Sequence, residues 1–554
     1  MSIIPDFVMA LVIAYLTPLL HWFSDRVYAD LLKRTPDHLL IQLEKRLDLT
    51  PVETACATFH HAEGPGTRPT HSVPQLVRAW LVKYLYDWSL RDLEWHVRYN
   101  LVVKWFVGYP VFAAGLDHST LDRFDQWVCV HQPRTLFDHI LHQIDADFPQ
   151  ERQQAQIGDT YALRANAAKE SLVRLLRHTG QRLLTALSKV DPARAVQVRT
   201  QFDLAALFGV KGELSEYHLT PVERAARLQT TVLAALACAR QVRTALEQPT
   251  PLSSEAALPI RAWLERLDKL IADEVHLSAD DTGQLTHVTE RAADDKGGYR
   301  LGSATDPDAT YRVHGDDKKD FGYNVNLAVT HNFIREIQAA TGAQPDPVAI
   351  PDLLRAQREH HDLLPNKFIY DTAAGAGKTR AQVAQATHGQ TQLVSPLLPY
   401  EKRTDRFTPE CFQLSDDSTQ LTCPNGQTTY LAYRSQSGDG RNFRFSGRQC
   451  RECPLWTQCR SQPLDSRAMR QVFISDYRPE IEAARAYNQM PDFKADMKRR
   501  PQVERIIAAL VRYNGARRAR RRGLLPADFQ AKMNATAYNI KRWVRLSPAH
   551  LQLA

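Results

Sequence analysis

Apolar and polar residues follow one another along this chain with a period that changes several times. Apolar residues at helical spacing occur in four segments: 72–131, 167–272, 491–513 and 527–544. In the first of these, Ser89 with Asp92 and Ser119 with Asp122 each have the spacing of a capping box, which marks a helix start. The second segment predicts long helices throughout. The chain therefore begins and ends in helical regions and carries a helical block near its middle.

Short runs rich in β-branched and aromatic residues lie between the helical segments and predict strands. One run, QAQIGDTYALRAN, has Asp159 near its centre, and another, KFIYD, ends at Asp371. Further strand-like runs with turns between them are found at 299–303, 321–330, 332–340 and 391–398. The alternation of strands and helices predicts an α/β core.

The acidic residues of two of these strands are candidates for metal chemistry. Asp159 and Asp371 have apolar neighbours, where a charge is costly unless a cation or another partner compensates it. Glu504 follows Arg500 by one helical turn, so both side chains project from the same face. Two magnesium ions about 4 Å apart, held by a few carboxylates, can cleave and transfer a phosphodiester. Taken singly, each residue has an ordinary explanation as a helix cap or a surface ion pair.

The positive charge of the chain is confined to one segment. The net charge is +8, and residues 494–522 contain eleven Lys/Arg and two acidic residues, so the remainder of the chain is close to neutral. Such a concentration is expected for an anionic polymer partner, and the alternative is a solvated basic helix.

Several of these blocks together resemble the DDE transposases of bacterial insertion sequences. The resemblance lies in GDTYALRANAA, DPDATYR, KKDFGYNVNLAVT, KFIYDTAAGAGKT and RPQVERIIAALVRYNGARRARRRGLLPADFQAKMNATAYNIKRW, and in HSVPQLVRAWLVKYLYDWSLRDLEWHVRYN with LDHSTLDRF before them. It implies a ribonuclease-H-like mixed sheet, with magnesium or manganese held by Asp159, Asp371 and Glu504. It also implies that Arg500 holds a DNA phosphate. We expect further DNA contacts from Arg512, Arg517, Arg518, Arg520, Arg521 and Arg522.

The activity implied by the resemblance is cleavage at terminal inverted repeats and strand transfer into target double-stranded DNA, by a homodimer on DNA. The chain departs from the family at Met497, where a Tyr is common, at Val511, where a Lys is common, and at Ala374. The Lys contact cannot be carried over, and Arg512 is a candidate substitute. Two alternatives stay open: a metal-dependent nuclease without strand transfer, and an inactive DNA-binding remnant.

The pattern and the resemblance together predict five parts. They are an N-terminal helical extension (1–68), a helical transposase N-terminal domain (69–150), a core in three pieces (151–166, 295–400 and 490–554), an all-α insertion (167–294) and a cysteine-bearing insertion (401–489).

Four of the eight cysteines lie within 37 residues of one another, at Cys423, Cys450, Cys453 and Cys459. One C-x2-C pair with two further cysteines could hold a structural zinc that staples an insertion without its own core, with Cys411 as an alternative ligand. Free thiols in a reducing compartment are the other interpretation, and we expect a cytoplasmic, nucleoid-associated protein.

Two further motifs suggest other functions and are set aside. GAGKT at 375–379 follows a strand, but a phosphate-binding loop needs a glycine at position 372, where the chain has Thr372. We expect these glycines to form the turn before a helix. The apolar run from Phe7 to Phe23 lacks the features of a signal peptide, and we expect a buried or oligomer-facing helix that does not enter a membrane.

Overall fold

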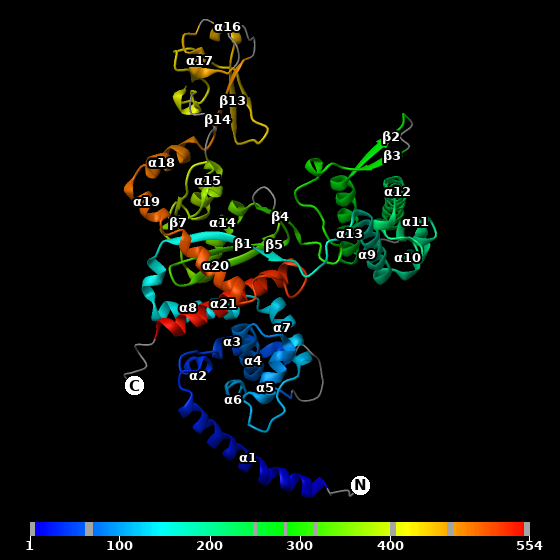
Figure 1. Ribbon diagram of the computed structural model, residues 1–554, viewed down its shortest axis with the longest axis vertical. Coiled ribbons are helices and arrows are strands. Elements are labelled where there is room, and N and C mark those ends of the chain that lie inside the picture. The colour runs from blue at the N-terminus through cyan, green and yellow to red at the C-terminus, as the bar shows by residue number, and fades with distance from the viewer. Residues whose placement is uncertain are drawn as a thin grey trace.

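The computed structural model describes residues 6–60, 70–247, 252–281, 285–314, 318–398, 406–451, 453–461 and 469–547. The N-terminal helices lie at one end of the molecule, a mixed sheet lies in the middle, and the cysteine-bearing insertion lies at the opposite end (Figure 1). The helical insertion projects from one side of the sheet. The predicted combination of a helical N-terminal region and a mixed α/β core is confirmed.

Helices make up the N-terminal region, and those within residues 72–131 are short, as predicted. The helices of the region are α1 (Asp6–Arg34), α2 (Leu39–Glu44), α3 (Thr50–Ala55), η1 (Ala57–His60), α4 (Val73–Tyr86), α5 (Leu90–Tyr99), α6 (Leu101–Val107), α7 (His118–His131), α8 (Thr135–Asp147) and η2 (Pro149–Gln153). The predicted capping box at the start of α5 is confirmed, since the Ser89 side chain accepts from the Asp92 N–H and Asp92 accepts from the Ser89 N–H. The cap predicted at Ser119 is wrong, because Asp117 caps α7 and accepts from the Ser119 and Thr120 N–H groups.

Helix α1 extends away from the other N-terminal helices (Figure 1). Of its described side chains, Leu19 is 57% exposed and Trp22 is 63% exposed. The expectation that these residues are buried within the chain is therefore wrong. The expected oligomer contact is not tested. No helix in the described part of the chain is both long enough and apolar enough to span a membrane.

The central sheet has the strand order β4-β5-β1-β7-β8, and β6 also pairs with β5. Its strands are β1 (Gln156–Arg164), β4 (Thr310–His314), β5 (Lys318–Val329), β6 (Ile334–Thr341), β7 (Lys367–Ile369) and β8 (Gln392–Val394). Strands β4, β5, β6 and β1 pair antiparallel, whereas β1, β7 and β8 pair parallel. Helices η5 (Asp346–Ala349), α14 (Ile350–His361), η6 (Thr372–Ala374) and α15 (Gly377–Ala386) connect the later strands. Residues 299–303, predicted as a strand, are irregular.

The last helical region does not run as one helix from 491 to 513. Residues 491–513 are divided into α19 (Pro491–Met497) and α20 (Pro501–Tyr513); α18 (Arg478–Asn488) precedes them and α21 (Leu524–Leu546) follows. The break lies at residues 498–500, because Pro501 cannot donate the N–H that would continue α19. Val503, Ile506 and Leu510 of α20 are buried in one cluster with residues of β1 and β5. This packing fixes α20 on the sheet.

The insertion between β1 and β4 is mainly helical, but it is not the all-α segment that was predicted. Its helices are α9 (Leu172–Val190), α10 (Pro192–Arg199), α11 (Leu204–Phe208), η3 (Glu216–His218), α12 (Pro221–Leu246) and α13 (Ser254–Glu274). After α13 the chain forms a hairpin of β2 (Val275–Ala279) and β3 (Leu285–Glu290), followed by η4 (Ala293–Asp295). Val275 and Val288 of the hairpin are buried in the same apolar cluster as the helices.

The cysteine-bearing insertion contains two small antiparallel sheets. Its elements are η7 (Pro409–Cys411), β9 (Gln413–Leu414), β10 (Leu421–Thr422), β11 (Thr428–Thr429), β12 (Ala432–Arg434), β13 (Gly440–Phe445), α16 (Gly447–Cys450), α17 (Trp456–Cys459) and β14 (Arg470–Ser475). The expectation that it lacks a core is wrong, since Phe412, Phe443 and Phe445 are buried together with three aliphatic residues. Cys423, Cys450 and Cys459 pack against this cluster.

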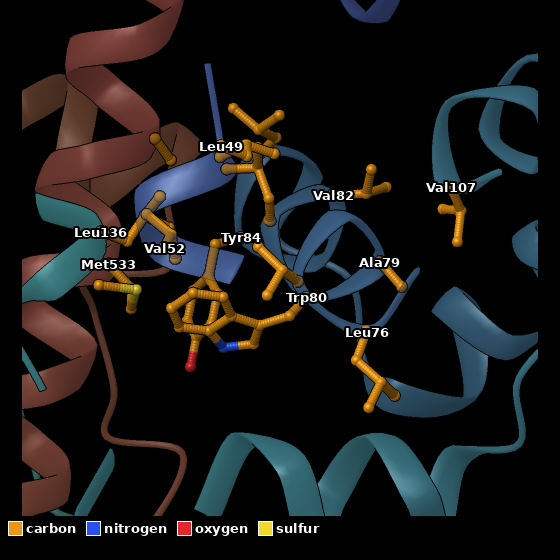
Figure 2. Packing of buried hydrophobic residues seen from close by; sticks show 14 of the residues in the cluster. Leu49, Val52, Leu76, Ala79, Trp80, Val82, Tyr84, Val107, Leu136 and Met533 are labelled. Carbon is orange, nitrogen blue, oxygen red and sulfur yellow. The ribbon is translucent and has the colours of Figure 1, made fainter. Parts of the chain in front are cut away.

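The N-terminal helices share their apolar core with α21. Figure 2 shows Met533 of α21 among the side chains of α3, α4 and α8, close to Trp80. The rings of Trp80 and Phe529 are stacked at a centroid distance of 6.0 Å and an angle of 9°. Trp543 belongs to the same cluster, and its indole N–H donates to Asp147 at 2.7 Å. The N-terminal region is therefore packed firmly on the last helix of the chain.

Candidate active site

The parallel pairing of β1 and β7 places two of the candidate carboxylates side by side. Ile157 of β1 pairs with Ile369 of β7. Asp159 and Asp371 each lie two residues further along, so both reach the same edge of the sheet at the carboxyl end of β7. Asp371 follows the end of β7 and also caps η6, since its carboxylate accepts from the Ala373 N–H at 2.9 Å. The cap predicted as the ordinary explanation for this residue is thus present as well.

The carboxylate of Asp159 is largely enclosed, with 17% of its side chain exposed. Burial raises the pKa of Asp159 above its ordinary value. The nearby carboxylates of Asp371 and Asp346 raise this pKa further, and the Thr160 N–H and the Arg500 guanidinium offset the rise only in part. Negative charge at this position is under-compensated, which is the condition in which an added cation is favoured.

Helix α20 brings the third carboxylate and a guanidinium to the same place. The Arg500 Nη2 atom lies 3.5 Å from the Asp159 carboxylate and 3.6 Å from the Asp371 carboxylate. The Nη1 atom of the same side chain lies 3.2 Å from the Glu504 carboxylate, as expected for residues one helical turn apart. Three carboxylates that are far apart in the sequence therefore converge on one guanidinium.

These three side chains are the right donors for a hard divalent cation, which prefers carboxylate oxygens. A positive charge already lies at the point where they converge, in the form of the Arg500 guanidinium. In the described residues, no three His, Cys, Asp or Glu side chains form a group that would hold a metal in its present arrangement. The donor set fits a divalent metal, and in this structure the Arg500 guanidinium contacts all three carboxylates.

Several residues around this centre were not anticipated from the sequence. Arg312 of β4 donates to the Thr160 hydroxyl at 2.6 Å and lies 3.6 Å from Asp346. The Ser395 hydroxyl, just after β8, donates to the Asp371 carbonyl at 2.6 Å. The buried Arg380 guanidinium in turn donates to the Ser395 carbonyl at 2.7 Å. These contacts join segments that are far apart in the sequence, so the sequence pattern could not predict them. The only available indication was that Ser395 lies in a run predicted as a strand.

The basic run after α20 is attached to the end of β1. The Arg164 N–H donates to the Arg517 carbonyl at 3.2 Å, and the Ala519 N–H donates to the Arg164 carbonyl at 2.8 Å. The side chains of Arg517 and Arg518 are exposed, and so is that of Arg512 on α20. Exposed guanidinium groups are therefore held near the strand that carries Asp159.

The other arginines of the run have protein partners. Arg520 forms an ion pair with Asp87. Arg521 lies 2.5 Å from Asp122 and 2.9 Å from Asp125, both in the N-terminal region. The Arg522 Nε atom donates to the Asn166 carbonyl at 3.1 Å, although its side chain is exposed. The DNA-binding role expected for these three residues stays a prediction, and Arg520 and Arg521 also serve an interface.

The glycines of GAGKT lie in the turn between η6 and α15, as predicted. A Cβ atom at Gly375 would lie 2.3 Å from the Pro396 carbonyl oxygen, and one at Gly377 would lie 2.7 Å from the Tyr477 Cβ. Lys378 is paired with Asp439 at 3.1 Å. Close packing explains these glycines without a bound phosphate.

The four cysteines proposed as zinc ligands lie in one region of the cysteine-bearing insertion. Burial raises the pKa of the Cys450 and Cys459 thiols, and Cys423 and Cys453 contribute to the rise at both. Cys411 is exposed and does not contribute to either shift. The four thiols are neighbours, but the described residues do not form a ready-made zinc site.

Two protein families match parts of the chain. The family described as Transposase DDE domain matches residues 422–544, which include α20 with Arg500 and Glu504. The family described as Transposase domain (DUF772) matches residues 29–127, which include most of the N-terminal helices. No curated protein and no solved structure gives a match. The two matches confirm that the chain is similar to the DDE transposases of insertion-sequence type.

Proposed function

We propose that this protein is a transposase that cuts DNA at the ends of a mobile element and joins the freed ends to target DNA. The observation that carries the proposal is the convergence of Asp159, Asp371 and Glu504 on one cationic group. The two family matches support a function in transposition, and transposases act on DNA. A ribonuclease-H-like core fits the central position of β1 between an antiparallel and a parallel half of the sheet.

In this proposal, Asp159 and Asp371 hold divalent metal ions from the edge of the sheet, and Glu504 completes the site from α20. The metal ions, magnesium or manganese, would activate the attacking hydroxyl or water and stabilise charge on the leaving oxygen. The two strand-borne carboxylates have fixed positions, because β1 and β7 are paired in register. Glu504, with 59% of its side chain exposed, can adjust to the substrate.

The DNA would lie across the face of α20 and the exposed arginines that follow it. Arg512, Arg517, Arg518 and Arg522 would contact phosphates, which carry no sequence information. Pairing of two copies through α1 is supported by its exposed apolar side chains. A structural zinc on Cys423, Cys450, Cys453 and Cys459 belongs to the same proposal, and the proximity of these thiols supports it.

The test is a strand-transfer assay on the DNA that flanks the protein's own coding region. Full-length protein with magnesium should nick this DNA and should join pre-cut ends with free 3′-hydroxyls to a plasmid. Asp371→Asn should lose both reactions and keep its affinity for the DNA. Nicking without joined products would identify a nuclease instead, and specific binding without either reaction would identify an inactive remnant.

A further inference from the structure

Arg500 occupies an unusual position for a residue expected to bind DNA. Its guanidinium lies within 3.6 Å of all three candidate carboxylates, and only 26% of its side chain is exposed. Its Nε atom is buried and has no hydrogen-bond partner within the described chain. Within the described residues, the guanidinium is the only cationic group that contacts these carboxylates.

The guanidinium and a metal pair would compete for the same oxygens. Two-metal catalysis needs two ions about 4 Å apart, each in direct contact with the carboxylates. A side chain that reaches all three carboxylates lies in the space between them, and its charge has the same sign as that of the metals. Metal binding therefore requires the guanidinium to leave this position.

A DNA phosphate can compete with the carboxylates for the Arg500 guanidinium. The planar guanidinium of an arginine can donate two parallel hydrogen bonds to two phosphate oxygens. This bidentate pair is stronger than the contact between the guanidinium and a single carboxylate oxygen at 3.5 Å. A phosphodiester at the catalytic centre lies beside the carboxylates by definition. Arg500 is the N-cap residue of α20, at the junction with α19, where its long side chain can change position without disturbing the helix.

We propose that Arg500 excludes divalent metal from Asp159, Asp371 and Glu504 until a DNA phosphate binds its guanidinium, so that DNA and metal bind cooperatively. This inference rests on the proposed function, because it takes the three carboxylates as the metal site. The consequence is an enzyme that carries no metal pair at its active site when DNA is absent. By reciprocity, DNA raises the metal affinity by the same factor as metal raises the DNA affinity.

The experiment measures manganese binding to the full-length protein by calorimetry and electron paramagnetic resonance, with and without a 30-base-pair duplex. For the wild type, the duplex should increase the manganese affinity about tenfold or more. Arg500→Gln should bind manganese about tenfold more tightly than the wild type in the absence of DNA, and the duplex should add little. Arg505→Gln is the matched control, because Arg505 is exposed on the same helix and has no ion pair in the described structure.

Equal manganese affinities for the wild type and Arg500→Gln without DNA would overturn the inference. The variants Asp159→Asn and Asp371→Asn separate this outcome from failure of the proposed function. If these two variants bind manganese as the wild type does, the carboxylates are not the metal site. If they lose manganese while Arg500→Gln matches the wild type, the site is correct and only the exclusion by Arg500 is wrong.

A second and independent observation is an open cavity of about 1650 Å³ within the helical insertion, bordered by Tyr311 of β4. Its acidic side chains are mostly engaged: Glu170 with His178, Glu213 with Arg177 and Arg227, and Glu274 with Lys296 and Arg300. Arg174, Arg199 and Arg224 also line it, are exposed and have no carboxylate partner among the described residues. Among the described residues that line the cavity, Glu216 is the one acidic side chain without an ion pair. The three unpaired arginines therefore leave the cavity with a net positive charge.

The size and position of this cavity fit a polymer that also enters the active site. Small-molecule pockets measure about 300 to 1,000 Å³, so this cavity is larger than a typical metabolite site. Tyr311 of β4 lines the cavity, and β4 lies two strands from β1, which carries Asp159. From these features we infer that the cavity holds the phosphate backbone of the DNA strand that leads to the catalytic carboxylates, an inference that rests on the proposed function.

Two triple variants with equal charge changes test this assignment. Arg174→Gln, Arg199→Gln and Arg224→Gln together should reduce the slope of log affinity against log salt by up to about 3 for a random 30-base-pair duplex. Arg182→Gln, Arg240→Gln and Arg261→Gln together should leave it unchanged, since these exposed residues on α9, α12 and α13 do not line the cavity. Equal slopes for the two triples would overturn the inference, whereas wild-type protein that does not bind DNA at all would refute the proposed function itself.

Discussion

The guanidinium of Arg521 lies 2.9 Å from the carboxylate of Asp125, a buried residue of the N-terminal region. The same carboxylate is 3.0 Å from the buried ammonium of Lys83 and accepts from the Trp80 indole and the Tyr84 hydroxyl. A residue of a conspicuously basic run is thus one partner in a buried polar network. Its neighbours Arg517 and Arg518 are exposed, so the run contains both network residues and residues open to solvent.

This division predicts different effects for two pairs of arginines. Arg520→Gln with Arg521→Gln should lower the free energy of unfolding by about 3 kcal/mol or more, because Asp125 is left with incomplete compensation. Arg517→Gln with Arg518→Gln should leave stability unchanged and reduce the salt slope of DNA binding by up to about 2. Urea unfolding and binding titrations at several salt concentrations measure the two effects. A loss of stability in the second pair, with no change of slope, would contradict the assignment.

The Asp125 network should also give the protein an acid-sensitive component of stability. Burial alone would raise the pKa of Asp125, but Lys83 and Arg521 outweigh it, so the pKa lies below the ordinary value of 3.8. A carboxyl whose folded-state pKa is lowered contributes stability above the unfolded pKa and loses it as the pH falls through the folded one. We expect wild-type stability to fall below about pH 4.

Asp125→Asn should lack this acid-dependent component and should be less stable at pH 7. Urea unfolding between pH 3 and pH 7 compares the two proteins. Asp147→Asn serves as a control for loss of a carboxylate at the same interface, since Asp147 bonds Trp543 and no basic side chain is among its described ion-pair partners. Parallel pH profiles for Asp125→Asn and the wild type would show that the network does not titrate in this way.

Gly158 sets the spacing between the two strands of the active site. A Cβ atom at this position would lie 2.5 Å from the Phe368 ring and 2.7 Å from the Tyr370 ring. Gly158→Ala should therefore push β7 away from β1, cost about 1 to 3 kcal/mol of stability and reduce cleavage by separating Asp159 from Asp371. In a Phe368→Leu background the same change should cost less, which a double-mutant cycle measures. An equal cost in both backgrounds would mean that the ring is not the obstacle.

The cysteine cluster predicts a defined metal content. If zinc is bound, purified protein should contain about one zinc per chain by elemental analysis, and Cys453→Ser should lower that content and destabilise the insertion. Cys411→Ser should leave the content unchanged, because Cys411 is exposed and outside the group of four. Folded and active protein without zinc would refute the site.

The sequence was informative where a local pattern decides the structure. The strands around Asp159 and Asp371 and the shared face of Arg500 and Glu504 follow from short apolar runs and helical spacing. The parallel register that brings the two aspartates together is a long-range pairing, which no local pattern specifies. The convergence of three carboxylates on Arg500 could be anticipated only through the family resemblance, which assigned that side chain to DNA.

Errors arose where distant segments decide the outcome. The hairpin β2–β3 directly follows a long helical pattern, and the contacts of Val275 and Val288 with distant helices stabilise it. Its own short sequence pattern was therefore too weak to predict two strands. The partners of Arg520 and Arg521 are more than 390 residues away, at Asp87 and Asp122. A run of arginines gives no indication of such partners, since charge density alone predicts exposure.

The packing of Phe529, Met533 and Trp543 among the N-terminal helices affects the order in which the chain can fold during its synthesis. The ribosome delivers α3 to α8 before α21, and the part of their apolar surface that contacts α21 is covered only when α21 emerges, after the whole sheet has been made. Domains usually fold as they appear, whereas here the N-terminal helices must wait for a helix that is made much later. A nascent or prematurely terminated chain would therefore expose the surface around Trp80, and we expect chaperones and proteases to recognise it before any such fragment could act on DNA.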